Sequence, residues 1–326
     1  MSFHQAHLSN ARISVAAIAL LACASSMAAG ADWPVKPVRI VLSTTPGGGT
    51  DIVTRMVGAK LSETFKQQFI VDSKPGAGGI IADDFVSKSP ADGYTLLFQS
   101  QSISVTPNLS KVPYNAITDF QPVAKLISQA FVIVATAKLP VKNLKELVSY
   151  SKTKTGGLNA AVPGAATSLT GGLFKLVTSS NMTLVPYKGG APASIALLNG
   201  EVDLGFMDIP SVAIHISSGK VNALAVTTEK RVRMIPKVPT VIEAGIPELK
   251  VEGWLASFAP ARTPADIVNR LNTEINTALR APDVSDRIYQ IGGEPAQTTV
   301  AEFSRFYQAE IAKWKDVIDR GHIKLD

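Results

Sequence analysis

The sequence predicts a two-lobed α/β fold in which each lobe is a mainly parallel sheet flanked by helices, with a ligand cleft between the lobes. Short apolar runs of strand length alternate with segments whose apolar residues recur at helical spacing, a pattern typical of parallel sheets covered on both faces. This alternation begins at residue 38 and restarts at about residue 131. The C-terminal segments show helical periodicity but contain too few strands for a domain of their own.

The first part of the chain predicts two strand–loop–helix units and a third strand. Residues 38–42 form an apolar strand, and a glycine loop leads into a helix whose apolar residues lie between 52 and 65. A second strand at 69–71 precedes another glycine loop and a helix over 80–86. Residues 94–98 supply the third strand, so these elements are expected to share one sheet.

The restarted pattern predicts a second sheet with its own helices. Strands are expected at 131–134, 158–161, 202–207 and 223–226, and helices at 144–150, 169–177, 193–198 and 210–216. A Pro163-Gly164 turn precedes the helix at 169–177, and Thr167 or Ser168 is expected to cap that helix.

The last part of the chain returns to a strand and then to helices. Residues 255–259 are expected to form a strand. Thr263 and Pro264 have the residue types of an N-cap and a first helical position, which predicts a helix that begins at Pro264 and has its apolar residues between 267 and 279.

The final helix is expected to begin with a capping box formed by Thr299 and Glu302. Because the C-terminal helices lack a sheet of their own, we expect them to cover the first lobe. Lobe 1 then comprises residues 32–130 plus 258–326, and lobe 2 is an insertion of residues 131–257. Such a chain crosses twice between its lobes, which predicts a hinge at the crossings.

The N-terminus has the pattern of a secretory signal peptide over residues 1–31. A basic residue precedes an apolar run at 13–24 that is too short to span a bilayer, and small residues at 29–31 offer a cleavage site. An alternative interpretation takes residues 20–23 as a lipoprotein box, which would lipidate Cys23 and tether the domain. Both interpretations predict an exported protein.

Composition argues against several classes of function. The only cysteine lies in the predicted signal peptide, so no disulfide, thiolate nucleophile or cysteine-bound metal is expected in the mature chain. The net charge of +6 is not gathered into a basic block, which argues against a nucleic-acid partner. Serine-hydrolase, zinc-protease, P-loop and dinucleotide motifs are absent from the sequence. We therefore expect no enzyme, no catalytic residue, no metal and no cofactor, with a carboxylate-dependent hydrolase as the enzymatic alternative.

Two glycine loops are the strongest candidates for a binding site. Each joins a predicted strand to a predicted helix start, where backbone N–H groups lack intrahelical partners and favour an anion. The expected binding residues are Thr45, Gly47, Gly48, Gly49 and Thr50 in the first loop, and Ala77, Gly78 and Gly79 in the second. Tight turns would also explain either loop alone, but the two loops together favour a carboxylate site, because glycine allows a ligand close to the backbone.

Four further polar residues are expected in the cleft. Ser100 follows the third predicted strand. Thr167 and Ser168 stand at a predicted helix start, where they either bind a ligand or cap the helix. Asp208 ends a buried strand, so it either accepts a hydrogen bond from a ligand ammonium or hydroxyl group or caps the next helix.

Several segments in a fixed order resemble the Bug family, the TctC-like extracytoplasmic receptors of tripartite tricarboxylate transporters. They are Pro-Gly-Gly-Gly-Thr-Asp at 46–51, Pro-Gly-Ala-Gly-Gly at 75–79, Asp-Gly-Tyr-Thr-Leu-Leu at 92–97 and Val-Pro-Tyr-Lys-Gly at 185–189. The resemblance covers residues 33–324. It implies a type II periplasmic binding protein fold that closes like a Venus flytrap, with the two glycine loops holding a ligand carboxylate.

The resemblance also implies the protein's partners. It implies a monomer in the periplasm that binds a small organic acid and delivers it to the membrane subunits of a tripartite tricarboxylate transporter; presentation to a membrane sensor kinase is the alternative. Where the family often has a polar Asn/Ser-rich segment, this chain has Pro-Gly-Ala-Ala-Thr-Ser at 163–168. This departure argues against a ligand with many carboxylates and leaves a mono- or dicarboxylate, an aromatic acid or an amino acid.

Overall fold

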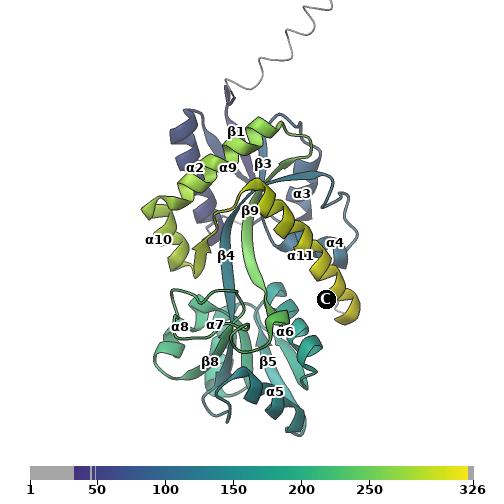
Figure 1. Cartoon of the computed structure of the whole chain (residues 1–326), viewed down its shortest axis with the longest axis vertical. Coiled ribbons are helices and arrows are strands. Elements are labelled where there is room, and N and C mark those ends of the chain that lie inside the picture. The colour runs from purple at the N-terminus through teal and green to yellow at the C-terminus, as the bar shows by residue number, and fades with distance from the viewer. Residues whose placement is uncertain (1–32, 45, 48, 322–326) are drawn as a thin grey trace, which may run out of the picture.

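The computed structural model describes residues 33–44, 46–47 and 49–321. The predicted signal peptide, including Cys23, and the loop residues Thr45 and Gly48 lie outside the described residues. The described chain forms two halves joined by two long strands, β4 (Phe120–Thr136) and β9 (Glu252–Pro260) (Figure 1). These two strands pair antiparallel along most of the length of β9 and form the centre of the molecule.

The upper half of Figure 1 contains a sheet with the strand order β2-β1-β3-β9-β4. Its remaining strands are β1 (Val38–Leu42), β2 (Phe69–Ser73), β3 (Thr95–Ser100) and β10 (Gly293–Pro295). β1 pairs parallel with both β2 and β3. β9 runs antiparallel to β3, and β10 runs antiparallel to β4.

The lower half continues the sheet from the other end of β4. Its strands are β5 (Leu158–Val162), β6 (Met182–Pro186), β7 (Leu204–Asp208) and β8 (Val221–Val226). β5 pairs parallel with β6 and β7, whereas β4 runs antiparallel to β7 and β8. The α/β class is confirmed, with parallel pairing confined to the outer strands, because the strands that connect the halves run antiparallel to their neighbours.

Helices cover both faces of the sheet in each half (Figure 1). The upper half has α2 (Gly49–Phe65), the short η1 (Ala77–Gly79), α3 (Ile80–Ser87), α4 (Ser102–Leu109), α9 (Ala265–Arg280) and α10 (Pro282–Gln290). The lower half has α5 (Leu144–Thr153), α6 (Ala165–Thr178), α7 (Gly190–Asn199), α8 (Ile209–Ser217) and the short η2 (Pro247–Leu249). Within the described ranges, no helix combines the length and apolar character needed to cross a membrane.

The last helix, α11 (Val300–Gly321), packs against both halves. Phe303 and Tyr307, near its start, belong to an aromatic core cluster of the upper half that includes Trp254 and Phe258. Trp314, further along the helix, belongs to a core cluster of the lower half. The helix therefore bridges the two halves beside β9, and does not lie against one lobe only.

Two predicted helix starts were wrong, and one was confirmed. α6 begins at Ala165 with Gly164 as its N-cap, because the Thr167 hydroxyl lies within the first turn and accepts the Gly164 N–H at 3.0 Å. α9 begins at Ala265, one residue later than expected. In α11 the predicted capping box is present. The Glu302 carboxylate accepts the Thr299 N–H, and the Thr299 hydroxyl accepts the Glu302 N–H.

Candidate functional site

The carboxyl ends of three neighbouring parallel strands meet at one edge of the upper sheet. β1 is followed by the start of α2, β2 by the second glycine loop and α3, and β3 by α4. In a sheet of this kind, ligands bind at the carboxyl ends of the strands, where loops and helix N-termini converge. The two predicted glycine loops and Ser100 are therefore brought to the same edge.

A cavity of about 210 Å³ lies where this edge faces the lower half. Its lining comprises Thr50, Ser100, Gln101, Ile127, Gln129, Phe131, Ala166, Asp208, Gly253, Trp254, Leu255 and Ile291. These residues come from the upper loops, from both connecting strands, and from the ends of β7 and α6 in the lower half. The cavity thus brings together three of the predicted binding residues, Thr50, Ser100 and Asp208.

Larger grooves lie elsewhere on the described surface but contain no predicted binding residue. One of about 970 Å³ runs between α6 and α11, and one of about 940 Å³ lies beside Lys125 and Glu252. Neither is formed at the carboxyl ends of the parallel strands. We therefore take the smaller cavity as the candidate site. Within the described residues, no group of three histidine, cysteine, aspartate or glutamate side chains is placed to hold a metal ion.

The first glycine loop already contains an internal anion. Asp51, in the first turn of α2, is buried and accepts the Gly47 N–H at 3.0 Å. The Arg55 guanidinium pairs with the same carboxylate and holds the pKa of Asp51 below its usual value. The Gly47 N–H is thus engaged by the protein itself. Thr50 lines the cavity, and Gly49 lies against the side chain of Ile291 from the cavity wall.

The second glycine loop has an unusual backbone. Gly76, Ala77, Gly78 and Gly79 all have positive φ angles, of 128°, 47°, 64° and 104°. Alanine pays about 1–2 kcal/mol for such a conformation, and strain of this kind concentrates at functional sites. The Gly79 N–H closes the turn by donating to the Gly76 carbonyl at 2.9 Å. A Cβ atom on Gly79 would lie only 2.6 Å from the Gln99 Nε2, so glycine is required there by contact as well as by φ.

At the start of α6, Ala166 lines the cavity in place of the expected Thr167 and Ser168. Ala166 lines the cavity, whereas Thr167 is buried and its hydroxyl donates back to the Gly164 carbonyl at 2.9 Å. The Ser168 N–H donates to the same carbonyl as part of the helix. Neither Thr167 nor Ser168 lines the cavity, because the helix begins earlier than predicted and turns Ala166 toward it.

Asp208 is the acidic group of the cavity wall. It occupies the N-cap position of α8, but its carboxylate makes no hydrogen bond to the helix, so the predicted alternative of a capping role is wrong. Burial raises the pKa of Asp208 above its usual value. A half-buried carboxyl group that faces a cavity is suited to accept a hydrogen bond from a ligand.

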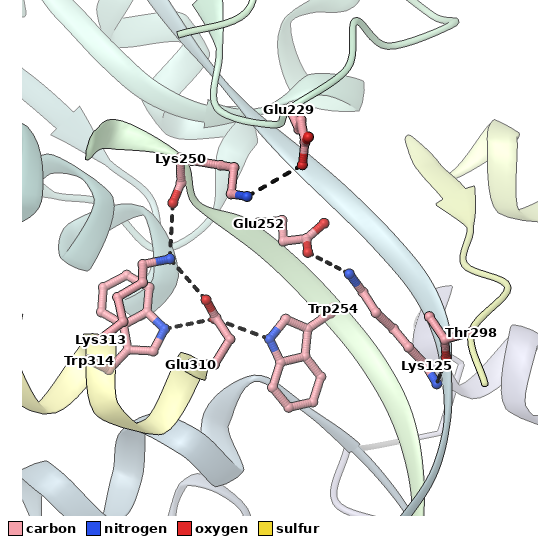
Figure 2. A network of polar contacts seen from close by, with 9 residues as sticks. All are labelled: Lys125, Glu229, Lys250, Glu252, Trp254, Thr298, Glu310, Lys313 and Trp314. Atoms are coloured by element: carbon pink, nitrogen blue, oxygen red, sulfur yellow. Dashed lines mark hydrogen bonds and ion pairs between the residues drawn. The ribbon is translucent and has the colours of Figure 1, made fainter. Parts of the chain in front are cut away.

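Trp254 is a wall residue that the sequence interpretation did not include. Figure 2 shows its indole N–H directed at Glu310 of α11, whose Oε2 accepts it at 3.4 Å and accepts the Trp314 indole N–H at 3.0 Å. Lys313 donates to the other oxygen of Glu310 and to the Lys250 carbonyl. This carboxylate thus ties the cavity wall to α11 and to the segment that precedes β9.

The connecting strands are linked by an ion pair between Lys125 of β4 and Glu252 of β9 (Figure 2). The Lys125 side chain is almost fully buried, and its Nζ lies 4.1 Å from the centre of the Phe306 ring. A buried pair of this kind holds two strands in register, because separating the charges leaves each without a partner. Its position fixes the geometry of the strands that carry the cavity wall.

Gln129 was also missed, for a reason visible in the sequence. It lies in the first part of β4, where Pro122 interrupts the apolar run, and proline argues against a central strand. The strand tolerates Pro122 because the β4–β9 register shifts there and again near Lys125. The signal that was available was the apolar pairs at 123–124 and 126–127, which lead into the strand expected at 131–134.

Comparisons with known proteins place this geometry in a family. A sequence model of the tripartite tricarboxylate transporter family receptor, TctC, matches residues 53–323. BugT of Bordetella pertussis is 34% identical over 300 residues, which cover 90% of this chain and 91% of BugT.

Two solved structures share the fold. Rpa4515 of R. palustris, solved with adipate, is 35% identical with a TM-score of 0.71, and the match covers 90% of this chain and 99% of that one. MatC of Rhodopseudomonas palustris, solved with bound malate, is 32% identical with a TM-score of 0.68, and the match covers 88% and 100%. The predicted resemblance is confirmed, and the chain belongs to the tripartite tricarboxylate transporter receptors of the TctC family.

Proposed function

We propose that this protein is a periplasmic receptor that binds one small organic acid in the cavity between its halves and delivers it to the membrane subunits of a tripartite tricarboxylate transporter. The observation that carries the proposal is the cavity itself, which lies at the carboxyl ends of the parallel strands and has walls from both halves. The adipate and malate bound by two relatives support a carboxylate ligand. In this proposal the protein is a monomer without catalytic activity, and residues 1–31 are its signal peptide.

Closure of the two halves is part of the proposal. We assign residues 32–130 plus 258–326 to one lobe and 131–257 to the other, with β4 and β9 as the connections that bend. Both connections contribute to the cavity wall through Phe131 and Gly253, so a ligand in the cavity contacts the hinge as well as the two lobes. Within this proposal the remaining predicted residues, Thr45, Gly47, Gly48, Gly49, Ala77, Gly78 and Gly79, border the ligand carboxylate at the start of α2. The Gly47 and Gly79 N–H groups are already engaged within the loops, so these two residues contribute close backbone approach and not a hydrogen bond.

The lining suggests which acids fit. The start of α2 at Thr50 offers backbone N–H groups and a favourable helix dipole to one carboxylate. Ile127, Phe131 and Trp254 offer apolar surface to a short carbon chain. Asp208 at the other wall accepts a hydrogen bond, and it repels a further carboxylate when ionised. A mono- or dicarboxylate with a hydroxyl or amino substituent satisfies all three features.

Binding can be tested with the purified protein and adipate, succinate, L-malate and L-glutamate. We expect at least one acid to raise the melting temperature and to bind with a Kd in the micromolar range, about −8 kcal/mol. Because Trp254 lines the cavity and is one of three tryptophans, binding should also change the intrinsic fluorescence. The corresponding amides are the controls. Equal binding of acid and amide would contradict the carboxylate site.

The pKa of Asp208 predicts opposite pH dependence for two ligand types. Burial raises this pKa, so the carboxyl group stays neutral to a higher pH than an exposed aspartate and becomes charged as the pH rises further. Above its pKa we expect succinate to bind about tenfold more weakly and L-glutamate, through its ammonium, about tenfold more tightly. Calorimetric titrations between about pH 5 and pH 8 measure both trends.

The matched control is Asp208→Asn, which keeps the size of the side chain and removes its charge. Its pH profile retains every other ionisation, namely that of the ligands and that of buried Asp83, whose pKa burial raises to about 6. We expect the opposite trends of the two acids to vanish in this variant. If wild type and Asp208→Asn show the same profile for both acids, Asp208 does not contact the ligand.

A further inference from the structure

A buried hydrogen-bond network lies directly beneath the edge of the sheet that forms the cavity. Gln99 of β3 and Asp83 of α3 are both fully buried. The Gln99 Nε2 donates to Asp83 Oδ1 at 2.5 Å, and the Tyr114 hydroxyl donates to Asp83 Oδ2 at 2.8 Å. Gln99 stands next to Ser100, which lines the cavity. The network is therefore one residue away from the cavity wall.

The orientation of the Gln99 amide is determined at both of its ends. At one end, an ionised carboxylate such as Asp83 can only accept, so the amide nitrogen faces it. At the other end, the backbone N–H of Ser100 can only donate, and it lies 2.9 Å from Gln99 Oε1. In the reverse orientation, the amide oxygen of Gln99 would face the Asp83 carboxylate, and the amide nitrogen would face the Ser100 N–H. Neither pair could form a hydrogen bond. The oxygen of Gln99 therefore points to the edge of the sheet.

Three serine side chains surround this oxygen. The Ser43 hydroxyl donates to Gln99 Oε1 at 2.5 Å, and the Ser102 hydroxyl donates to it at 3.2 Å. The Ser100 hydroxyl lies 3.1 Å from the Ser102 Oγ and 3.5 Å from Gln99 Oε1. Each hydroxyl proton thus has an acceptor inside the network. All three serines are half-exposed, and Ser100 is the one that lines the cavity. The Ser100 Oγ accepts the Ser102 N–H at 3.4 Å, so its remaining lone pair is what it offers to a ligand.

We propose that Gln99 is a positioning residue for ligand specificity: by taking the serine hydroxyl protons, it makes this edge of the cavity accept hydrogen bonds and favour acids that carry a hydroxyl or amino donor. Asp83 supports it by fixing the amide nitrogen. The inference rests on the proposed receptor function. It places an acceptor surface on the upper half in addition to Asp208 on the lower half. The ligand carboxylate then binds elsewhere, at the start of α2.

The second glycine loop is built around the same residue. The site for a Cβ at Gly79 is 2.6 Å from Gln99 Nε2 and 3.4 Å from Ser102 Oγ, so the loop backbone packs directly on the network. Burial raises the pKa of Asp83 to about 6, and the network can be measured in a single state at a pH well above this value. Burial also raises the pKa values of Tyr114 and Tyr307 above the usual range, which keeps both phenols neutral there.

The test compares L-malate with succinate, which differ only in one hydroxyl group, by calorimetry at about pH 7.5. Wild type should bind L-malate more tightly. Gln99→Met keeps the length of the side chain but removes the acceptor, so the serine protons are free to turn toward the ligand. We expect the ratio of the two Kd values to fall about tenfold in this variant.

The exchange variant Asp83→Asn with Gln99→Glu serves as the rescue. In it the new amide nitrogen at position 83 donates to the new carboxylate at position 99. The other oxygen of that carboxylate accepts from the serines, so all hydrogen-bond directions at the cavity are those of wild type. We expect the ratio of Kd values to return to within about twofold of wild type. A purely structural role of Gln99 would change the melting temperature but leave this ratio unaltered.

The possible results separate the two proposals. If wild type binds none of the acids, the receptor function fails and the inference fails with it. If wild type binds both acids but prefers succinate, or if folded Gln99→Met keeps the wild-type ratio, the inference alone is overturned. A folded exchange variant that does not restore the ratio overturns it as well. Melting temperatures of all variants establish that each one is folded.

Discussion

Gly79→Ala is expected to weaken the binding of the best acid about 100-fold, which corresponds to about 2.7 kcal/mol. Two effects act together. At φ 104°, alanine is strained, and its Cβ would meet the Gln99 Nε2 at 2.6 Å. The second glycine loop must then move away from β3, or Gln99 must leave Asp83. Either movement disturbs the edge of the sheet where Ser100 lines the cavity, and calorimetry with the acid identified by thermal shift measures the loss.

The matched control for this prediction is Gly156→Ala. Gly156 also has a positive φ, of 79°, but a Cβ there would meet no atom within 4 Å, and the residue lies in a turn of the lower half away from the cavity. It therefore carries the backbone strain without the contact. We expect it to lower stability modestly and to leave the Kd unchanged. Equal losses of binding in the two variants would show that strain anywhere in the chain, and not the contact with Gln99, is responsible.

Gly78 and Gly79 of the second loop differ in the contacts that an added Cβ atom would make. A Cβ on Gly78 would lie 3.7 Å from the Thr106 hydroxyl, an ordinary contact, and its φ of 64° is tolerated by some other residues. We predict that a β-branched residue at Gly78 also abolishes binding, but there through backbone strain alone. Gly79 is the position where strain and contact coincide.

Glu310→Ala is expected to lower the free energy of unfolding by about 3–5 kcal/mol, the usual cost of removing one partner from a buried charge pair. Glu310 is almost fully buried and accepts hydrogen bonds from Trp254, Trp314 and Lys313. Without it, two indole N–H groups and a partly buried ammonium lose their acceptor. Urea denaturation measures the change. Because two of the three tryptophans contact this carboxylate, their fluorescence should change even in the folded variant.

Asp316→Ala is the control on the same helix. Asp316 is exposed and pairs with Arg320 one turn later, and such surface pairs contribute little. We expect its unfolding midpoint to lie close to that of wild type. If Glu310→Ala is no less stable than Asp316→Ala, then the hydrogen bonds of Glu310 do not tie α11 to β9. The same comparison, made with bound acid, shows whether this link also supports the cavity wall at Trp254.

Most of the elements could be predicted from the sequence because local periodicity determines them. The strands at 38–42 and 158–161 are apolar except at Arg39 and Asn159, which are exposed, and the structure confirms or extends them as β1 and β5. The capping box that starts α11 is likewise a local pattern. Local signals were too weak for α10, in which only Val284 and Ile288 are buried, and for the part of β4 that contains Pro122.

The residues that line the cavity could be predicted only where their position follows from the end of a strand. Ser100 and Asp208 terminate β3 and β7, and Thr50 lies in the first turn of the helix after β1, so parallel pairing brings them toward the cleft. Thr167 and Ser168 failed as cavity residues because a shift of the helix start by a few residues rotates each side chain to another face. No local signal reports such a shift.

By itself, the sequence of this protein determined the alternation of strands and helices, the glycine loops and, through the order of its motifs, the receptor family. These features depend on residues that are close together in the chain. Only the tertiary structure decided which polar groups are free to meet a ligand. Gln99 takes the Ser43 hydroxyl proton across 56 residues of chain, Asp83 accepts from Tyr114 across 31, and Glu310 holds Trp254 across 56. Hydrogen bonds between distant residues are chosen by folding, because each donor pairs with whichever acceptor the packed elements bring within reach.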